Sequence, residues 1–365
     1  FNNFALVKIM NYFTKNTLLS FKEDIGNPIE LNFNDESSAV VSEYGGRLLG
    51  LYPKNNCYSL LWINPEIKEV VKTRGRDIGG DRYWISPERE FFYEKPQTWE
   101  GWFCPHGLDP AYYEILAESS TSCTLSSTVT VESQIKKHIY NGEITRQISL
   151  IKEPISTGLS YCGVEFVDDC VFFQPNLKIN GWSLACIISG GPSNPGTVLI
   201  PTKPNPKPLS YFRTIPEDRL NIGDNYVSFK LDVDDVYKLA IRPEDIDFTR
   251  HAKIGYILNI PDSEEFGFLV KLSNDIPKTQ DDCFDISRDH PEGEIGVIQS
   301  YNSESPNKPS LKYGEIELQL SQFDPIDNAS HGKARHQLIG YIGSKEEVLE
   351  VVEKYLGIAN FDLFL

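Results

Sequence analysis

The chain has 365 residues, of which 40% are hydrophobic and 12% aromatic, and its formal net charge is −17. So acidic a surface repels phosphate backbones and anionic lipids, which argues against nucleic-acid and membrane partners. No segment reaches the roughly 18 consecutive apolar residues of a membrane-spanning helix. The seven cysteines show no CxxC spacing and imply neither a zinc knuckle nor a full disulfide framework, so we expect reduced thiols in a cytoplasmic protein.

Short β-prone runs separated by turn residues dominate the sequence. We interpret residues 1–28 as an N-terminal extension and residues 29–365 as a single domain. The first strands are expected at residues 29–34, 39–44, 47–52 and 58–63.

The dipeptide Asn141-Gly142 gives the clearest local prediction. It readily adopts the positive φ values of a type I′ turn, and it lies between β-prone residues 133–140 and 143–151. This pattern predicts a hairpin that turns at Asn141-Gly142. Residues 122–131, just before it, alternate like a half-exposed strand.

The remaining chain repeats the same rhythm and ends in one helix. Proline is frequent over residues 192–216, which we interpret as a long surface excursion rather than a linker. The helix is expected over residues 344–356, where Ser344 and Glu347 form a capping box and Gly357 supplies the stop. Further strands are expected at 159–166, 184–189, 197–200, 226–233, 237–241, 253–259, 266–272, 296–300, 315–320 and 336–342. The sum predicts an all-β fold with large antiparallel sheets and one C-terminal helix.

Three segments resemble the galactose-mutarotase-like (aldose epimerase-related) superfamily. They are YGGRLLGLY at 44–52 with LLWINPE at 60–66, GGDRYWISPE at 79–88, and YNSESPNKPSLKYGEIELQ at 301–319. The resemblance implies a β-supersandwich with a sugar cleft on one concave face.

Alternation in GEIELQ places Glu315, Glu317 and Gln319 on one face of a strand. Mutarotation needs a base that takes the proton of the anomeric hydroxyl and an acid that protonates the ring oxygen. The order Glu-Leu-Gln resembles the Glu-x-Gln of the mutarotase base. Glu317 is therefore the candidate general base, with Glu315 and Gln319 as substrate-binding residues. The alternative is that all three face solvent on an exposed strand.

Asp81, Arg82, Trp84 and the upstream Arg76 are the candidate substrate-binding residues of the second segment. An arginine can bind a carboxylate or a pair of hydroxyls with two parallel hydrogen bonds, and an indole can stack on a sugar ring. This density of arginine in an acidic chain points to an anionic sugar, although ordinary Arg–Asp pairing explains it equally well.

Two histidines complete the candidate site. His106 lies in an aromatic-rich loop and is the candidate acid, because its ordinary pKa is near neutrality. His336 follows the Glu317 strand and is a candidate substrate-binding residue. The chain departs from the family at 172–182, where the resemblance would place an Asn-His pair but no histidine occurs. This departure puts the usual acid of the family in doubt.

The sequence leaves three functions open. The favoured function is a sugar mutarotase or epimerase that acts at the anomeric centre. The second is a glycoside hydrolase, for which Asp81, Glu88 and Glu317 could supply the paired carboxyl groups, or a polysaccharide lyase acting on glycans that could be anionic. The third is a non-catalytic carbohydrate-binding or sensor domain. All three take a mono- or oligosaccharide partner. No nucleotide-binding or metal-binding motif is present, so no cofactor is implied.

Overall fold

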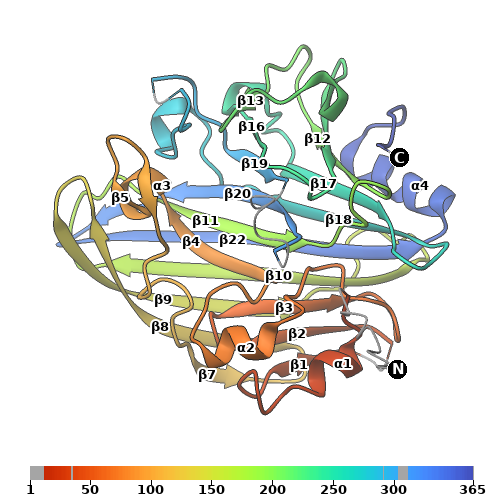
Figure 1. Ribbon diagram of the computed structural model, residues 1–365, viewed down its shortest axis with the longest axis horizontal. Helices are drawn as coiled ribbons and strands as arrows, with labels where there is room; N and C mark the ends of the chain where they lie inside the picture. Colours follow the sequence, from red (N-terminus) through yellow and green to blue (C-terminus); the bar gives the residue numbers. More distant parts are fainter. Residues whose placement is uncertain (1–11, 34–35, 291, 303–310, 365) are drawn as a thin grey trace, which may run out of the picture.

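The computed structural model describes residues 12–33, 36–290, 292–302 and 311–364, and its strands form two large sheets (Figure 1). One sheet has nine strands, in spatial order β1 (Ile29–Leu31), β2 (Ser38–Ser42), β3 (Arg47–Tyr52), β4 (Asp81–Ser86), β11 (Asn180–Ile187), β20 (Gly314–Gln322), β19 (Ile298–Tyr301), β16 (Lys238–Ile241) and β13 (Leu209–Ser210).

The second sheet has eleven strands. Its main order is β14 (Leu220–Ile222), β15 (Tyr226–Leu231), β12 (Gly196–Pro201), β17 (Ala252–Asn259), β18 (Phe266–Ser273), β22 (Ala329–Gly343), β10 (Ser160–Phe172), β9 (His138–Leu150), β8 (Ser122–Ser133) and β7 (Glu114–Glu118), with β21 (Asp324–Ile326) paired to β22. Two short strands, β5 (Tyr93–Lys95) and β6 (Glu100–Trp102), pair only with each other. Neighbouring strands pair antiparallel in both large sheets, which confirms the predicted all-β class.

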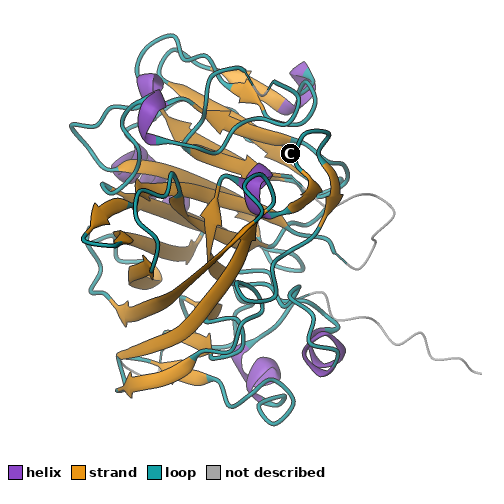
Figure 2. Ribbon diagram, turned by 90° about the vertical axis from the view of Figure 1, so that its left-hand side faces the viewer, coloured by secondary structure: helices purple, strands orange, loops and turns teal. Residues whose placement is uncertain are grey.

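Helices are few and short, as the purple segments of Figure 2 show. The α-helices of the described residues are α1 (Lys15–Leu19), α2 (Ile67–Lys72), α3 (Glu88–Phe91) and α4 (Lys345–Leu356), and the 3-10 helices are η1 (Glu217–Arg219), η2 (Pro243–Asp245) and η3 (Gln280–Asp282). In the described residues no helix has both the length and the apolar character to cross a membrane.

The predicted C-terminal helix is confirmed as α4. The Ser344 hydroxyl accepts a hydrogen bond from the Glu347 backbone N–H, and the Glu347 carboxylate accepts one from the Ser344 N–H. The helix ends at Gly357, which has a φ of +70°. Val348 and Val352 are fully buried and pack in a cluster that includes Phe268 of β18.

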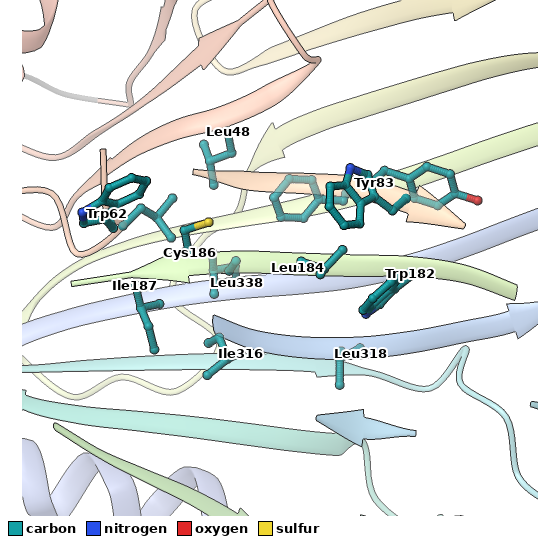
Figure 3. Close-up of a cluster of buried hydrophobic side chains, with 14 of the residues drawn as sticks. Leu48, Trp62, Tyr83, Trp182, Leu184, Cys186, Ile187, Ile316, Leu318 and Leu338 are labelled. Atoms are coloured by element: carbon teal, nitrogen blue, oxygen red, sulfur yellow. The ribbon is translucent and has the colours of Figure 1, made fainter. Parts of the chain in front are cut away.

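The main core fills the space between the sheets. Figure 3 shows Leu48 of β3, Ile316 of β20 and Leu338 of β22 in one buried cluster. Every residue of β4 and β11 is buried, because both faces of these central strands are covered. By contrast, β8 alternates between buried and exposed residues, as its sequence predicts.

The hairpin predicted at Asn141-Gly142 is wrong. The turn between β8 and β9 lies at residues 134–137, where Lys137 has a φ of +52°, and Asn141 and Gly142 lie inside β9. Gly142 is paired with β8 on one side and β10 on the other. A Cβ added there would lie 2.0 Å from the Val171 carbonyl oxygen. The glycine therefore permits close approach of β10 rather than a turn.

The strand predicted at residues 58–63 is also wrong. Tyr58, Leu61 and Ile63 form only isolated bridges, and the N–H of Trp62 donates to the carbonyl of Cys186 at 2.9 Å. Of the strand expected at 29–34, residues 29–31 form β1, and residue 34 lies outside the described residues.

Two segments that were expected to lie outside the core of the domain are part of it. Residues 1–11 of the expected extension lie outside the described residues, but Phe13, Leu18 and Ile25 are buried in the main core. The proline-rich segment 192–216 supplies β12, which pairs with both β15 and β17, and β13 at the edge of the other sheet. This segment is therefore part of the domain rather than a linker.

Candidate functional site

A pocket of about 340 Å³ lies over the centre of the nine-stranded sheet. Five adjacent strands supply its base, and α3, the β5–β6 hairpin and loops supply its rim. We call it the aromatic pocket; it is lined by Arg76, Arg82, Trp84, Glu88, Tyr93, Trp99, Trp102, Trp182, Leu184, Phe212, Val236, Lys238, Arg288, Tyr301, Tyr313 and Glu315.

Strand register explains why the base of the pocket combines these residue types. Trp84 of β4 is paired with Trp182 of β11, and Arg82 is paired with Leu184. Alternate residues of a strand project from the same face, so all four side chains point to one side of the sheet. Figure 3 shows Trp182 and Leu184 projecting from β11.

The same alternation applies to the neighbouring strand β20. Glu315, Glu317 and Gln319 are paired with Cys186, Leu184 and Trp182 of β11, respectively. These three polar side chains therefore share the pocket side of the sheet, but only Glu315 lines the cavity.

Tryptophan is concentrated at this site. Four of the five tryptophans in the chain line the pocket. The indole N–H groups of Trp84, Trp102 and Trp182 donate to Asp109, Glu88 and Glu317, respectively, at 2.9–3.0 Å. Trp102 is 39% exposed. These hydrogen bonds fix the ring orientations and leave the apolar ring surfaces for contact with a ligand.

The arginines of the pocket are paired with carboxylates and with indole rings. The guanidinium of Arg82 is 2.7 Å from Glu315 and lies 4.2 Å from the centre of the Trp84 ring. The guanidinium of Arg76 is 2.8 Å from Asp77 and 4.7 Å from the centre of the Trp102 ring. Ordinary Arg–carboxylate pairing thus accounts for the arginine density of the sequence.

Glu88 is the second carboxylate that lines the pocket. Burial raises the pKa of Glu88, the nearby Lys238 opposes this rise, and the charges of Asp285 and Glu315 add to it. The carboxylate accepts a hydrogen bond from the Trp102 indole, and the backbone N–H of Glu88 donates to Asp285 at 3.1 Å. Glu88 therefore keeps its proton to a higher pH than an ordinary glutamate does.

Glu317 lies behind the pocket wall. Its carboxylate is fully buried and is 3.0 Å from both the Lys238 ammonium and the Trp182 indole nitrogen. Burial raises the pKa of Glu317 to about 7; Lys238 opposes this rise and Glu315 adds to it. Its second oxygen, Oε1, has no hydrogen-bond partner among the described residues.

Gln319 is also buried behind the wall. It accepts a hydrogen bond from the Ser86 hydroxyl at 2.6 Å and donates one to Asp285 at 3.2 Å. Because Asp285 also accepts from the backbone N–H of Glu88, Gln319 supports the pocket rim through Asp285.

Asp81 and His336 lie away from the aromatic pocket, in a fully buried ionic network between the two sheets. Arg146 contacts Asp168 at 2.7 Å and Asp81 at 3.1 Å, and Lys271 is ion-paired with Asp81. The His336 ring is 2.7 Å from Asp168, and burial lowers the pKa of this histidine. Asp81 is adjacent to Arg82 in β4 and so projects to the opposite face of the strand.

His106 is exposed in the loop before β7 and does not line the pocket. Of the predicted site residues, Arg76, Arg82, Trp84 and Glu315 meet at the pocket, and Glu317 and Gln319 stand directly behind it.

Sequence reasoning missed the residues that come to the pocket from distant segments. The strongest signal that was available is the segment TWEGW at 98–102, which carries two of the five tryptophans. Lys238 and Arg288 have no local motif and reach the pocket only through the fold. The missed lining residues are Tyr93, Trp99, Trp102, Trp182, Leu184, Phe212, Val236, Lys238, Arg288, Tyr301 and Tyr313.

Comparisons with known proteins give a family and a number of similar structures. The model of a family of unknown function, DUF6786, matches residues 11–362. The chain is similar to the GalM/aldose epimerase homologue from C. elegans, with 11% identity, coverage of 87% of this chain and 98% of that chain, and a TM-score of 0.42. It is also similar to galactose 1-epimerase from Lactobacillus acidophilus, with 10% identity, coverage of 87% and 96%, and a TM-score of 0.44. No curated protein matches the sequence.

Proposed function

The chain belongs to DUF6786, a family of unknown function, so its activity has to be inferred from its pocket, and we propose that this pocket binds a saccharide ring and interconverts its anomers. The observation that supports this proposal is the gathering of four of the five tryptophans around two carboxylates and a buried arginine. A pyranose ring presents apolar C–H faces and a rim of hydroxyls, and it therefore matches a pocket with aromatic walls and a few charged groups.

The size of the pocket fits a single sugar unit. Its volume of about 340 Å³ is at the small end of the usual range for ligand sites, about 300–1,000 Å³. Trp84 and Trp182 meet edge to face at the base, with ring centres 5.7 Å apart, and Trp102 stands at the rim. This arrangement favours a monosaccharide, or one terminal sugar of a longer chain.

Anomer interconversion needs one carboxylate as base and one carboxylic acid as proton donor. In the proposal, ionised Glu315 takes the proton of the anomeric hydroxyl, and protonated Glu88 gives a proton to the ring oxygen. The bond between C1 and the ring oxygen breaks, and the open-chain aldehyde turns about the C1–C2 bond. Reclosure on the other face returns both protons, so neither glutamate is changed over the cycle.

The different surroundings of the two glutamates support these roles. Arg82 is ion-paired with Glu315 at 2.7 Å, whereas burial and neighbouring negative charges raise the pKa of Glu88. Two carboxyl groups whose surroundings differ in this way can serve as base and acid at the same pH.

Glu317, the base suggested by the sequence, is the alternative to Glu315. Its pKa of about 7 suits a general base, but its carboxylate is fully buried and does not line the cavity. We therefore give Glu317 the role of holding Lys238 and Trp182 at the pocket.

Trp102→Ala is expected to weaken sugar binding about tenfold, because loss of the stacking surface removes about 1–1.5 kcal/mol. Trp102 is partly exposed at the rim, so its removal leaves the core intact. Isothermal titration with a panel of aldoses, uronic acids and sugar phosphates measures the change.

Phe173→Ala is the matched control, because Phe173 is a 56% exposed aromatic residue that does not line the pocket. Equal binding by the Trp102 variant and the wild-type protein, for every sugar that binds, would remove the aromatic pocket as the site. A sugar that binds without any change in its rate of mutarotation would instead indicate a non-catalytic binding module.

The rate of anomer interconversion is expected to fall as the pH rises through the pKa of Glu88. The sign follows from the protonation state: Glu88 acts as an acid only while it holds a proton, and its raised pKa extends this form to higher pH. NMR or polarimetry of a freshly dissolved single anomer gives the pH profile. Loss of the alkaline limb in Glu88→Gln supports the assignment, and an unchanged limb in that variant contradicts it.

A further inference from the structure

A second pocket, of about 280 Å³, lies beside the C-terminal end of α4. It is formed by the end of β12, the start of β17 and the end of α4, three elements that lie at the same end of the molecule in Figure 1. We call it the basic pocket; it is lined by Pro201, Thr202, Lys203, Pro204, Asn225, Ile246, Asp247, Arg250, His251, Ala252, Lys253, Leu356 and Gly357.

The charge of this pocket is opposite to that of the chain. Lys203, Arg250 and Lys253 line it, with Asp247 as the single carboxylate, whereas the whole chain has a net charge of −17. In so acidic a protein, general attraction of anions to the surface is weak. Binding of an anion at this pocket would therefore depend on the charged side chains of the pocket itself.

The cations are only partly neutralised by the protein. The Lys253 ammonium donates to the Tyr355 carbonyl at 2.7 Å, and the Lys203 ammonium donates to the Glu244 carbonyl at 3.0 Å. The guanidinium of Arg250 has no hydrogen-bond or ion-pair partner in the described part of the chain, whereas its backbone N–H donates to the Asp247 carbonyl at 3.2 Å. Burial and the neighbouring Arg250 guanidinium lower the pKa of Lys253. Hydrogen bonds from Thr249 and the charges of Arg250 and Lys203 lower the pKa of Asp247, so this carboxylate offsets part of the positive charge.

A buried hydroxyl completes the set of polar groups. Thr202 is 9% exposed and lines the pocket, and its Oγ1 has no hydrogen-bond partner among the described residues. A buried polar atom without a partner is costly, unless a ligand or water supplies one. The Oγ1 atom is itself closed off from the cavity, so it can donate to an anion there only after the Thr202 side chain rotates.

We propose that the basic pocket binds the phosphate group of a small phosphorylated molecule. Arg250 offers a planar fork that matches phosphate oxygens, Lys253 offers a half-buried ammonium, and Thr202 offers a hydroxyl donor. A bound phosphate relieves the repulsion between the two cations. The cavity leaves room beyond the phosphate group, so the ligand is an ester rather than the free ion.

The test is calorimetric titration of the purified chain with inorganic phosphate and with glycerol 3-phosphate at constant ionic strength. The ester lacks a sugar ring, so it does not address the aromatic pocket. We expect the ester to bind more tightly than inorganic phosphate, and Arg250→Gln to weaken its binding at least tenfold. Thr202→Val conserves shape and charge, and we expect it to weaken binding severalfold.

Lys72→Gln is the control, because it removes the same charge at a 78% exposed side chain in α2, which is not part of the basic pocket. Equal weakening by Lys72→Gln and Arg250→Gln would show non-specific attraction and overturn the proposal. Failure of both phosphate compounds to bind at millimolar concentration would also overturn it, and binding of inorganic phosphate alone would exclude the ester.

Discussion

Arg146→Met is expected to lower the free energy of unfolding by about 3–5 kcal/mol, because it leaves buried carboxylates without their partner. The Arg146 guanidinium is fully buried and contacts both Asp168 and Asp81. It also donates to the Gly46 carbonyl at 2.8 Å. Methionine replaces the unbranched stem of arginine but not the Cζ, Nη1 and Nη2 atoms, so the loss combines the missing charge and hydrogen bonds with a small cavity. Equilibrium denaturation in urea measures it.

Arg335→Met is the matched control in the same sheet. Arg335 is 62% exposed and ion-paired with Glu165, and an exposed pair contributes about 0–1 kcal/mol. Losses of similar size in the two variants would mean that the buried network contributes no more to stability than a surface ion pair.

Glu315→Gln is expected to reduce the rate of anomer interconversion by about 10²–10⁴-fold while sugar binding persists. The amide keeps the shape of the side chain and one acceptor oxygen for Arg82, which is 2.7 Å from the carboxylate in the wild-type protein. It cannot take a proton from the anomeric hydroxyl. The rate and the dissociation constant are measured on the same preparation, after thermal denaturation has shown that the variant is folded.

Glu317→Gln separates the two candidate bases. If Glu315 is the base, the Glu317 variant keeps measurable turnover, and its main change is weaker binding, because Lys238 loses its ion pair while the amide oxygen can still accept from Trp182. If the Glu315 variant stays active and the Glu317 variant is inactive, the base is Glu317, and the carboxylate must move into the cavity during the reaction.

Local sequence patterns correctly predicted the strands and the helix in which the conformational preferences of the residues agree with their tertiary contacts. The strand at 47–52 and the capped helix α4 lie where their alternation and capping residues indicate. The prediction of a turn at Asn141-Gly142 is wrong because the pairing of β9 with strands on both sides outweighs the turn preference of these two residues. Such pairing depends on segments distant in the sequence, which a short window does not contain.

The site was predictable to the extent that alternation places residues on a strand face. Arg82 and Trp84 are two residues apart and share the pocket side of β4, whereas Asp81 projects into the ionic network. Because every residue of β4 is buried, its sequence does not reveal which face meets the ligand pocket. The same holds for Glu315 and Glu317: the order of residues places both on one face, but only the packing of Trp182 and Lys238 decides which one is accessible.

Because tryptophan is concentrated at the aromatic pocket, the intrinsic fluorescence of the protein can report whether a ligand occupies that pocket. Four of the five indoles line one cavity, so most of the intrinsic fluorescence originates there. Indole emission depends on the polarity of its surroundings, and a ligand that displaces water from the cavity changes those surroundings for most of the emitters at once. The remaining indole, Trp62, packs on Tyr313, which lines the same cavity, with ring centres 4.6 Å apart. Ligands can therefore be screened by the tryptophan fluorescence of the unlabelled protein.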